Sequence, residues 1–377
     1  MLSRIIFFGL SLRLLVAIWN GFFGPSFGAE FDALSFHLDA VLYARNPTLD
    51  EFRIGWIYTY FLGLFYYLTA ESLFLGSLLS CVAWFFSALI LLRCLRIFAV
   101  ERAMQNKAMF IYALLPSSIM YTAITIREPY QLLFVNLAIY AALKINFHNA
   151  SRHWFTLVLA TAGAGLLHGA LMAFGILFFA GTILLVSVHG KKRISLVSLG
   201  VTASISAVVL WFGLSAFGHI AYSLDEGLGT AIEVYQQGLL TVDARTHYKL
   251  DVTISSLADF LVIVPVGFIQ YLFEPFPWNV STAADGVLLM ENILRGWLIW
   301  KAWSAVRVAP ISQRRILFFI LIAYLILEAF WSVGTINWGT SVRHHLPAWG
   351  LLLLAVYAVS NKENSKNYQN KINPAKL

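Results

Sequence analysis

The chain has 377 residues, of which 59% are hydrophobic and only 12% are charged, and its mean hydropathy is +0.74. Soluble domains carry roughly a quarter charged residues, so this composition excludes an ordinary soluble domain, a disordered chain and a disulfide scaffold. Basic loops beside membrane spans explain the net charge of +7, so we expect a lipid bilayer and no nucleic acid as partner. Cys81 and Cys94 would lie about 20 Å apart on one helix, too far for a disulfide.

Apolar runs of about 16 to 24 residues recur along the chain and predict an all-α polytopic transmembrane helical bundle. We expect ten spans, with twelve as the alternative. No small-x-small cleavage site follows the first run, so it is predicted to be a retained helix rather than a signal peptide. The predicted spans begin near Ile5, Ser72, Ala108, Pro129, Trp154, Leu171, Ile194, Ala283, Ile316 and His345.

Most basic residues fall on one side of these ten spans, which the positive-inside rule makes the cytoplasm. This orientation requires two apolar segments to lie in the outer interface as interfacial helices. They are Ile54–Leu68, which is short and rich in Trp and Tyr, and Leu257–Phe273, which Pro265 interrupts. We predict one transmembrane domain over residues 1–360, with outer loops at 24–71, 217–283 and 334–344. A polar cytoplasmic tail follows at 361–377.

The first outer loop contains two acids and a histidine directly after the first span: Glu30, Asp32 and His37. A carboxylate at a membrane boundary can accept a proton from an acceptor hydroxyl, which makes Asp32 the first candidate for a general base. Glu30 and His37 are further candidates. The alternative is that Asp32 only caps the helix that follows it.

The second outer loop ends in Arg127-Glu128-Pro129, a charged pair between two apolar spans. Burying charged side chains in a membrane costs free energy unless they form an ion pair or serve a function. Glu128 is a candidate second acid or metal ligand, and Arg127 is a candidate phosphate clamp. The alternative is a self-satisfied pair with Glu128 at a helix N-terminus.

The last outer loop ends in Arg343-His344-His345, after Asn337-Trp338-Gly339-Thr340. The arginine fork binds phosphate bidentately, which predicts an anion site, while an interfacial Trp, Arg and His belt is the alternative. The loop from His219 to Lys249 contains Arg245 and is interpreted as a lid or saccharide-binding surface, or as a solvated loop.

Few ionisable residues fall inside the spans. Glu291 and Arg295 stand four positions apart and are expected to pair, Glu328 has no obvious partner, and His168 is expected to be a satisfied interior histidine. The chain has no phosphate-cradling glycine loop, zinc spacing or nucleophile elbow, so nothing points to nucleotide hydrolysis or proteolysis.

Together these features resemble the GT-C superfamily of integral-membrane glycosyltransferases, which use polyprenyl-phosphate-linked sugars. Asp32, in Asp-Ala-Leu-Ser-Phe-His, looks like the superfamily's essential acid, and Arg127-Glu128 is similar to its second acidic site. Ile54–Leu68 looks like its juxtamembrane helices. Pro275-Phe276-Pro277-Trp278 and the stretch from Asn337 to His344 look like motifs of members in bacterial surface-polysaccharide gene clusters.

The resemblance implies a GT-C-like fold and an inverting transferase at the periplasmic face of a bacterial inner membrane. The enzyme would move a sugar from a polyprenyl-phosphate donor to a glycan or lipid-linked acceptor during O-antigen, capsule or lipopolysaccharide synthesis. The implied catalytic residues are Asp32, Glu30 and Glu128, and the implied substrate-binding residues are Arg127, Arg343, His344, His345, His37 and Arg245. The second site has no Asp-x-Asp pair, so no metal ligand is assigned and a divalent cation stays an open alternative.

Two other functions remain open at this point. An O-antigen or capsule polymerase would use the same face and leaving group but would join lipid-diphosphate-linked repeat units. A lipid-linked-sugar flippase or transporter is less favoured, because transporters bind substrate at a polar midplane site and the polar residues here crowd one face.

Overall fold

The computed structural model describes residues 1–24, 30–48, 54–148, 150–189, 245–248 and 257–358, and this part of the chain is helical without a β-strand. Five of its helices are long and apolar enough to cross a bilayer. They are α1 (Leu2–Phe22), α4 (Leu73–Ile97), α7 (Glu128–His148), α9 (Gly169–His189) and α15 (Ile311–Gly334). The chain therefore has the character of a polytopic membrane protein.

Shorter, broken or more polar helices complete the described part. They are α2 (Glu30–Arg45), α3 (Ile57–Leu68), α5 (Arg102–Leu114), α6 (Pro116–Tyr121), α8 (His153–Leu167), α13 (Leu257–Phe273), α14 (Ala283–Val308), α16 (Trp338–His344) and α17 (Trp349–Tyr357). The span expected near Ile194, most of the 217–283 loop and the 361–377 tail lie outside the described residues. The total of ten spans thus stays a prediction.

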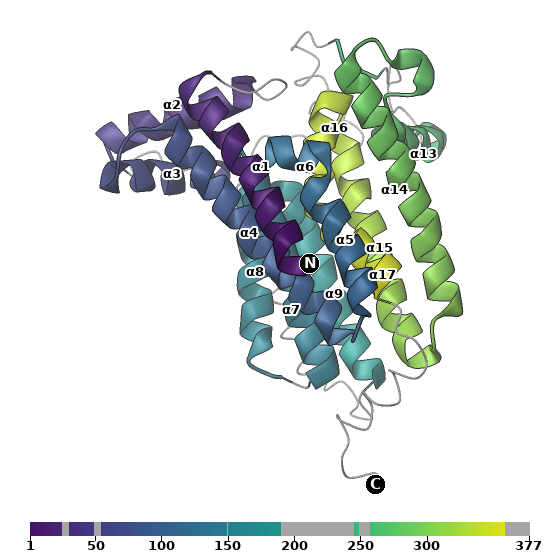
Figure 1. Cartoon of the computed structure of the whole chain (residues 1–377). Coiled ribbons are helices and arrows are strands. Elements are labelled where there is room, and N and C mark those ends of the chain that lie inside the picture. Colours follow the sequence, from purple (N-terminus) through teal and green to yellow (C-terminus); the bar gives the residue numbers. More distant parts are fainter. Residues whose placement is uncertain (25–29, 49–53, 149, 190–244, 249–256, 359–377) are drawn as a thin grey trace.

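The two ends of the bundle differ in composition. Figure 1 shows the α4–α5, α7–α8 and α14–α15 connections at one end, where Arg96, Arg102, Arg152 and Arg307 lie; we call this the basic end. Helices α2, α6 and α16 lie at the opposite end, which we call the site end (Figure 1). The basic clusters of these loops that lie among the described residues are therefore together in space.

Close packing of α7 against α4, α8 and α17 forms the centre of the bundle. Asn136 of α7 donates from Nδ2 to Ser87 Oγ at 2.8 Å and to the Tyr112 hydroxyl at 2.9 Å. Gly350 of α17 lies so near that a Cβ there would stand 1.9 Å from Asn136 Oδ1. Only glycine fits at this position, because a side chain would displace the buried amide.

Helices α2 and α3 pack on each other and run across the direction of the long helices (Figure 1). An ion pair between Arg45 and Glu71, 2.7 Å apart, ties the end of α2 to the segment after α3. Large apolar side chains cover the outer surface of the pair, namely Phe31, Leu38, Leu42, Phe61, Leu64, Tyr67 and Leu68. An apolar surface on a transverse helix pair suits a membrane interface, as we expect for Ile54–Leu68.

The span predicted to start at Ala108 is interrupted in the structure. Helix α5 ends at Leu114 and α6 restarts at Pro116, because proline has no N–H to donate and its ring clashes with the preceding turn. Each end of this break has a charged partner from another helix. Broken helices persist in apolar surroundings where neighbouring side chains replace the lost backbone bonds.

Arg13 of α1 supplies the donor side of this arrangement and is fully buried. Its guanidinium donates to the Ala113 carbonyl at 2.8 Å, to Ser118 Oγ at 2.9 Å and to Thr122 Oγ1 at 2.7 Å, and it lies 3.5 Å from the centre of the Trp84 ring. The charge pattern places Arg13 in the inner half of the first predicted span, and in the structure its side chain is buried inside the bundle.

Glu291 of α14 supplies the acceptor side. Its Oε1 accepts from the Ser117 N–H at 2.8 Å, at the start of α6. The expected pair of Glu291 with Arg295 is therefore wrong: Arg295 donates instead to the Leu272 carbonyl and to Asn292 Oδ1, both at 2.7 Å. The Ser117 N–H at the start of α6 is thus the partner of Glu291, and the Leu272 carbonyl near the end of α13 is a partner of Arg295.

We expect Arg13→Leu to lower the free energy of unfolding by at least about 3 kcal/mol, because the Ala113 carbonyl and the Ser118 hydroxyl then lose a buried donor. Thermal unfolding of the purified protein in detergent measures this. The matched control is Arg4→Leu, which removes an exposed arginine from the same helix and should leave the melting temperature nearly unchanged. Equal shifts in the two variants would contradict the assigned role.

Candidate functional site

An ion pair between Asp32 and Arg343 joins two segments that are 311 positions apart in the chain. Asp32 lies in the first turn of α2, and Arg343 lies at the end of α16. Nη1 of Arg343 donates to Oδ2 of Asp32. The arginine side chain is only 12% exposed while the aspartate is 49% exposed, so the carboxylate is the part that solvent or a substrate reaches.

Local sequence places both partners. Asn337 caps α16, with its Oδ1 accepting from the Thr340 N–H at 2.7 Å, and this fixes the short helix that ends in Arg343. On the other side, Ala33 of α2 packs with Ile124 and Ile126 of the loop before α7. The same loop leads directly to Glu128, so α2, α7 and α16 meet at the site end.

Glu128 is the first residue of α7 and is buried. Burial alone would lower the pKa of the Arg343 guanidinium, but the carboxylates of Glu128 and Asp32 more than offset this and raise it. Within the described part of the chain, Oε2 of Glu128 and Nε of Arg343 are buried without a hydrogen-bond partner. The site thus holds one unused acceptor and one unused donor.

Arg127 is half-buried, and the alternative of a self-satisfied pair with Glu128 is not found among the described ion pairs. Its Nη1 donates to the Leu167 carbonyl at 3.3 Å, and its guanidinium lies 5.7 Å from the centre of the Phe36 ring of α2. Arg127 therefore links α2 to the end of α8. It adds positive charge to the same region as Arg343.

His344 stacks on Trp331 of α15, with ring centres 3.9 Å apart, and its Nδ1 lies 2.8 Å from Thr335 Oγ1. Its ring centre is 5.9 Å from that of His168, whose Nδ1 accepts from the Ala170 N–H at 3.2 Å. Burial, and then the nearby His168 and Arg343, hold the pKa of His344 well below its ordinary value. His344 is thus a neutral ring beside the arginine.

His345 belongs to a different environment from its neighbour. Its Nδ1 lies 2.7 Å from Oε2 of Glu328, and its Nε2 lies 3.2 Å from the Tyr271 carbonyl. Both side chains are almost fully buried. His345 is therefore the partner of Glu328 that the sequence could not identify, and its side chain points into the core.

Arg245 lies beside α16 but pairs elsewhere. The segment 245–248 runs antiparallel to 336–338, with the Tyr248 N–H donating to the Ile336 carbonyl at 3.1 Å. Arg245 contacts both carboxylate oxygens of Asp285 at 2.9 and 3.0 Å, and Asp285 also accepts from Trp338 Nε1 at 3.2 Å. Sequence analysis missed Asp285, although Thr282-x-x-Asp285 is a capping box before an apolar helix.

Several hydrogen bonds converge on the Asp285 carboxylate. Burial alone would raise its pKa, but bonds from Arg245, Thr282 and Trp338 outweigh burial and lower it. Asp285 is therefore a stable anion that fixes the position of α16 through Trp338. Its role is structural support for the segment that contains Arg343.

His37 has a partner other than the Asp32–Arg343 pair. His37 Nδ1 lies 3.0 Å from the Tyr66 hydroxyl of α3, and burial lowers its pKa. Glu30 begins α2, and its side chain lies outside the described residues. Among the residues that the structure describes, no three His, Cys, Asp or Glu side chains gather to hold a metal ion.

Comparison of the chain with protein-family models, with curated proteins and with solved structures gave no match.

We expect the protein to lose stability as the pH falls from 7.5 to 5.5, because the folded-state pKa of His344 lies below the unfolded value of about 6.5. The unfolded chain then binds the proton first, so the stability present above pH 6.5 is lost progressively below it. Melting temperatures measured across this range should show a shallower slope for His344→Phe, which keeps a ring on Trp331. The exposed His148→Phe is the matched control and should keep most of the slope; a wild-type slope in His344→Phe would contradict the assignment.

Proposed function

We propose that the chain is a membrane glycosyltransferase that moves a sugar from a polyprenyl-phosphate donor to a glycan or lipid-linked acceptor. The observation that carries the proposal is the convergence of Asp32, Glu128 and Arg343 from three helices, with one donor and one acceptor unused. Buried polar atoms without partners are rare in proteins and call for an explanation such as a catalytic role.

The distribution of charge supports a periplasmic site in a bacterial inner membrane. Arginines collect at the opposite end of the bundle from Asp32 and Arg343 (Figure 1). If the basic end faces the cytoplasm, as the positive-inside rule requires, the site end faces outward. Lipid-linked sugars used in surface-polysaccharide synthesis would be acceptable substrates there, because their headgroups lie at the membrane boundary.

In the proposed reaction, the donor phosphate binds the guanidinium of Arg343, which offers Nη and the unused Nε as a fork. A phosphate oxygen would replace Asp32 as partner of the arginine and release the aspartate. Asp32, being half-exposed, then accepts the proton of the acceptor hydroxyl. The acceptor oxygen forms a bond to the anomeric carbon, the bond from that carbon to the phosphate oxygen breaks, and the lipid phosphate leaves with the electron pair, which inverts the carbon.

Glu128 acts as a positioning residue in this scheme. Its carboxylate lies in the electrostatic neighbourhood of Arg343 and favours the charged guanidinium without an ion pair of its own. The ring of His344, kept neutral by burial and by nearby positive charge, interacts electrostatically with both Arg343 and Arg127. This environment keeps fixed positive charge where negative charge develops on the leaving phosphate.

We expect Asp32→Asn and Arg343→Ala each to reduce sugar transfer by about 10²- to 10³-fold, the usual cost of removing one preorganised group from a transition state. The assay supplies membranes containing each variant with a panel of labelled polyprenyl-phosphate sugars. Asp39→Asn is the matched control, because it changes another carboxylate of α2, whose hydrogen-bond partner among the described residues is the Ser35 hydroxyl at 3.4 Å. Normal transfer by both site variants at wild-type protein levels would reject the proposal.

We expect Arg343→Lys to retain less transfer than its unchanged charge suggests, because an ammonium group lacks the planar fork that binds phosphate bidentately. Measuring kcat and KM separately distinguishes the roles. A loss in kcat fits stabilisation of the departing phosphate, whereas a change in KM alone would assign Arg343 to binding only.

A further inference from the structure

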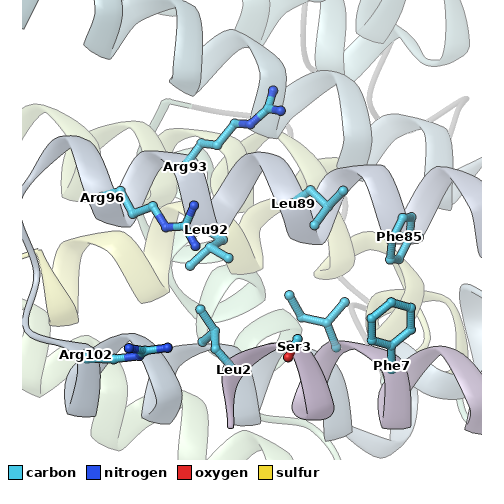
Figure 2. Close-up of a pocket in the computed structure, with 10 residues that line it drawn as sticks. Leu2, Ser3, Phe7, Phe85, Leu89, Leu92, Arg93, Arg96 and Arg102 are labelled. Atoms are coloured by element: carbon cyan, nitrogen blue, oxygen red, sulfur yellow. The ribbon is translucent and has the colours of Figure 1, made fainter.

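A second polar feature lies at the basic end, far from the proposed catalytic residues. A cavity of about 370 Å³ opens between α1, α4 and the start of α5. Figure 2 shows Leu2, Ser3 and Phe7 of α1 on one side and Phe85, Leu89 and Leu92 of α4 on the other. Its size is within the range of sites for small molecules or single lipid chains.

Three arginines line one end of this cavity, namely Arg93, Arg96 and Arg102. Arg96 and Arg102 extend from α4 and α5 toward the gap beside Leu2 (Figure 2). All three are exposed, and none forms an ion pair with a carboxylate in the described part of the chain. Positive charge is therefore concentrated there, and although Glu101 precedes Arg102 in the chain, it forms no ion pair with these arginines among the described residues.

The position of Arg102 also favours an anion. It stands in the first turn of α5, a helix of 13 residues, where the helix dipole is positive and an arginine is unfavourable. The N-cap residue Glu101 makes no side-chain hydrogen bond to the helix, and no acidic residue follows it in the first turn of α5. An external anion at this point would be attracted both by the guanidinium groups and by the helix N-terminus.

Beyond the arginines, the cavity wall is apolar. Phe7 is 58% exposed, and its ring centre lies 6.2 Å from that of Phe85. Leu89 lines the same side of α4, one helical turn from Arg93. A ligand that fills the cavity must therefore combine a negative head with an apolar chain that follows the two spanning helices.

We propose that this cavity binds one anionic phospholipid of the leaflet at the basic end. Its phosphate lies between Arg96 and Arg102, and an acyl chain lies along Phe7, Phe85 and Leu89. Basic pockets between membrane-spanning helices bind lipid headgroups in this way. A zwitterionic lipid would bring a cation toward the guanidinium groups of Arg96 and Arg102, and inorganic phosphate would leave the apolar wall uncovered. The proposal does not depend on the transferase activity.

Native mass spectrometry of the purified full chain, titrated with phosphatidylglycerol, tests this. We expect one retained lipid in the wild type and at least about tenfold weaker binding in Arg96→Gln/Arg102→Gln, because the two charge-assisted contacts are lost. The matched control is Arg307→Gln/Arg315→Gln, which removes two exposed arginines outside the cavity at the same end and should bind as the wild type does.

Separate arms use phosphatidylethanolamine and inorganic phosphate as probes. Equal binding of phosphatidylethanolamine, or equal loss in both double variants, would overturn the proposal, because either result indicates nonspecific retention. Equal binding of inorganic phosphate would show a phosphate site and reject the lipid. Leu89→Trp narrows the apolar part at unchanged charge and should weaken lipid binding; unchanged binding in this variant would also contradict the proposed chain position, even if the arginine variant fails to fold.

Discussion

The break between α5 and α6 leaves buried backbone groups that need hydrogen-bond partners inside an apolar bundle. The arrangement of the site end depends on the side chains that supply these partners. Arg13 bonds the Ala113 carbonyl before the break, and Glu291 accepts from the Ser117 N–H after it. A charged residue is costly within a bundle unless it is fully hydrogen-bonded. Here Arg13 donates to a carbonyl at the end of α5, and Glu291 accepts from an N–H at the start of α6. The break is therefore stable and α6 keeps a defined direction.

That direction determines where the polar residues of the site lie. Helix α6 leads through the buried Ile124 and Ile126 to Glu128, and the same loop packs on Ala33 of α2. Helix α16 contacts α6 and is fixed from its other side by the bond between Trp338 and Asp285. The ion pair of Asp32 with Arg343 closes this arrangement between the first and last thirds of the chain.

Hydropathy and charge alone predict the helical character, the two differently charged ends and the candidate residues Asp32, Glu128 and Arg343. They do not predict the partners of buried charges. The spacing of Glu291 and Arg295 suggests a local pair, yet a backbone N–H 174 positions away is the actual partner of Glu291. Likewise, nothing local separates His344 from His345, which point to Trp331 and to Glu328. Contacts that depend on a break in another helix cannot be derived from periodicity.

The wide separation of Asp32 and Arg343 in the chain has a consequence for biosynthesis. During insertion from the N-terminus, α2 reaches the membrane surface long before the arginine that neutralises its aspartate is made. Asp32 of α2 therefore has no arginine partner while the helices between α2 and α16 are synthesised and packed. The Asp32–Arg343 pair therefore forms at one of the last steps of synthesis, and any truncated product that stops before α16 lacks the arginine partner of Asp32.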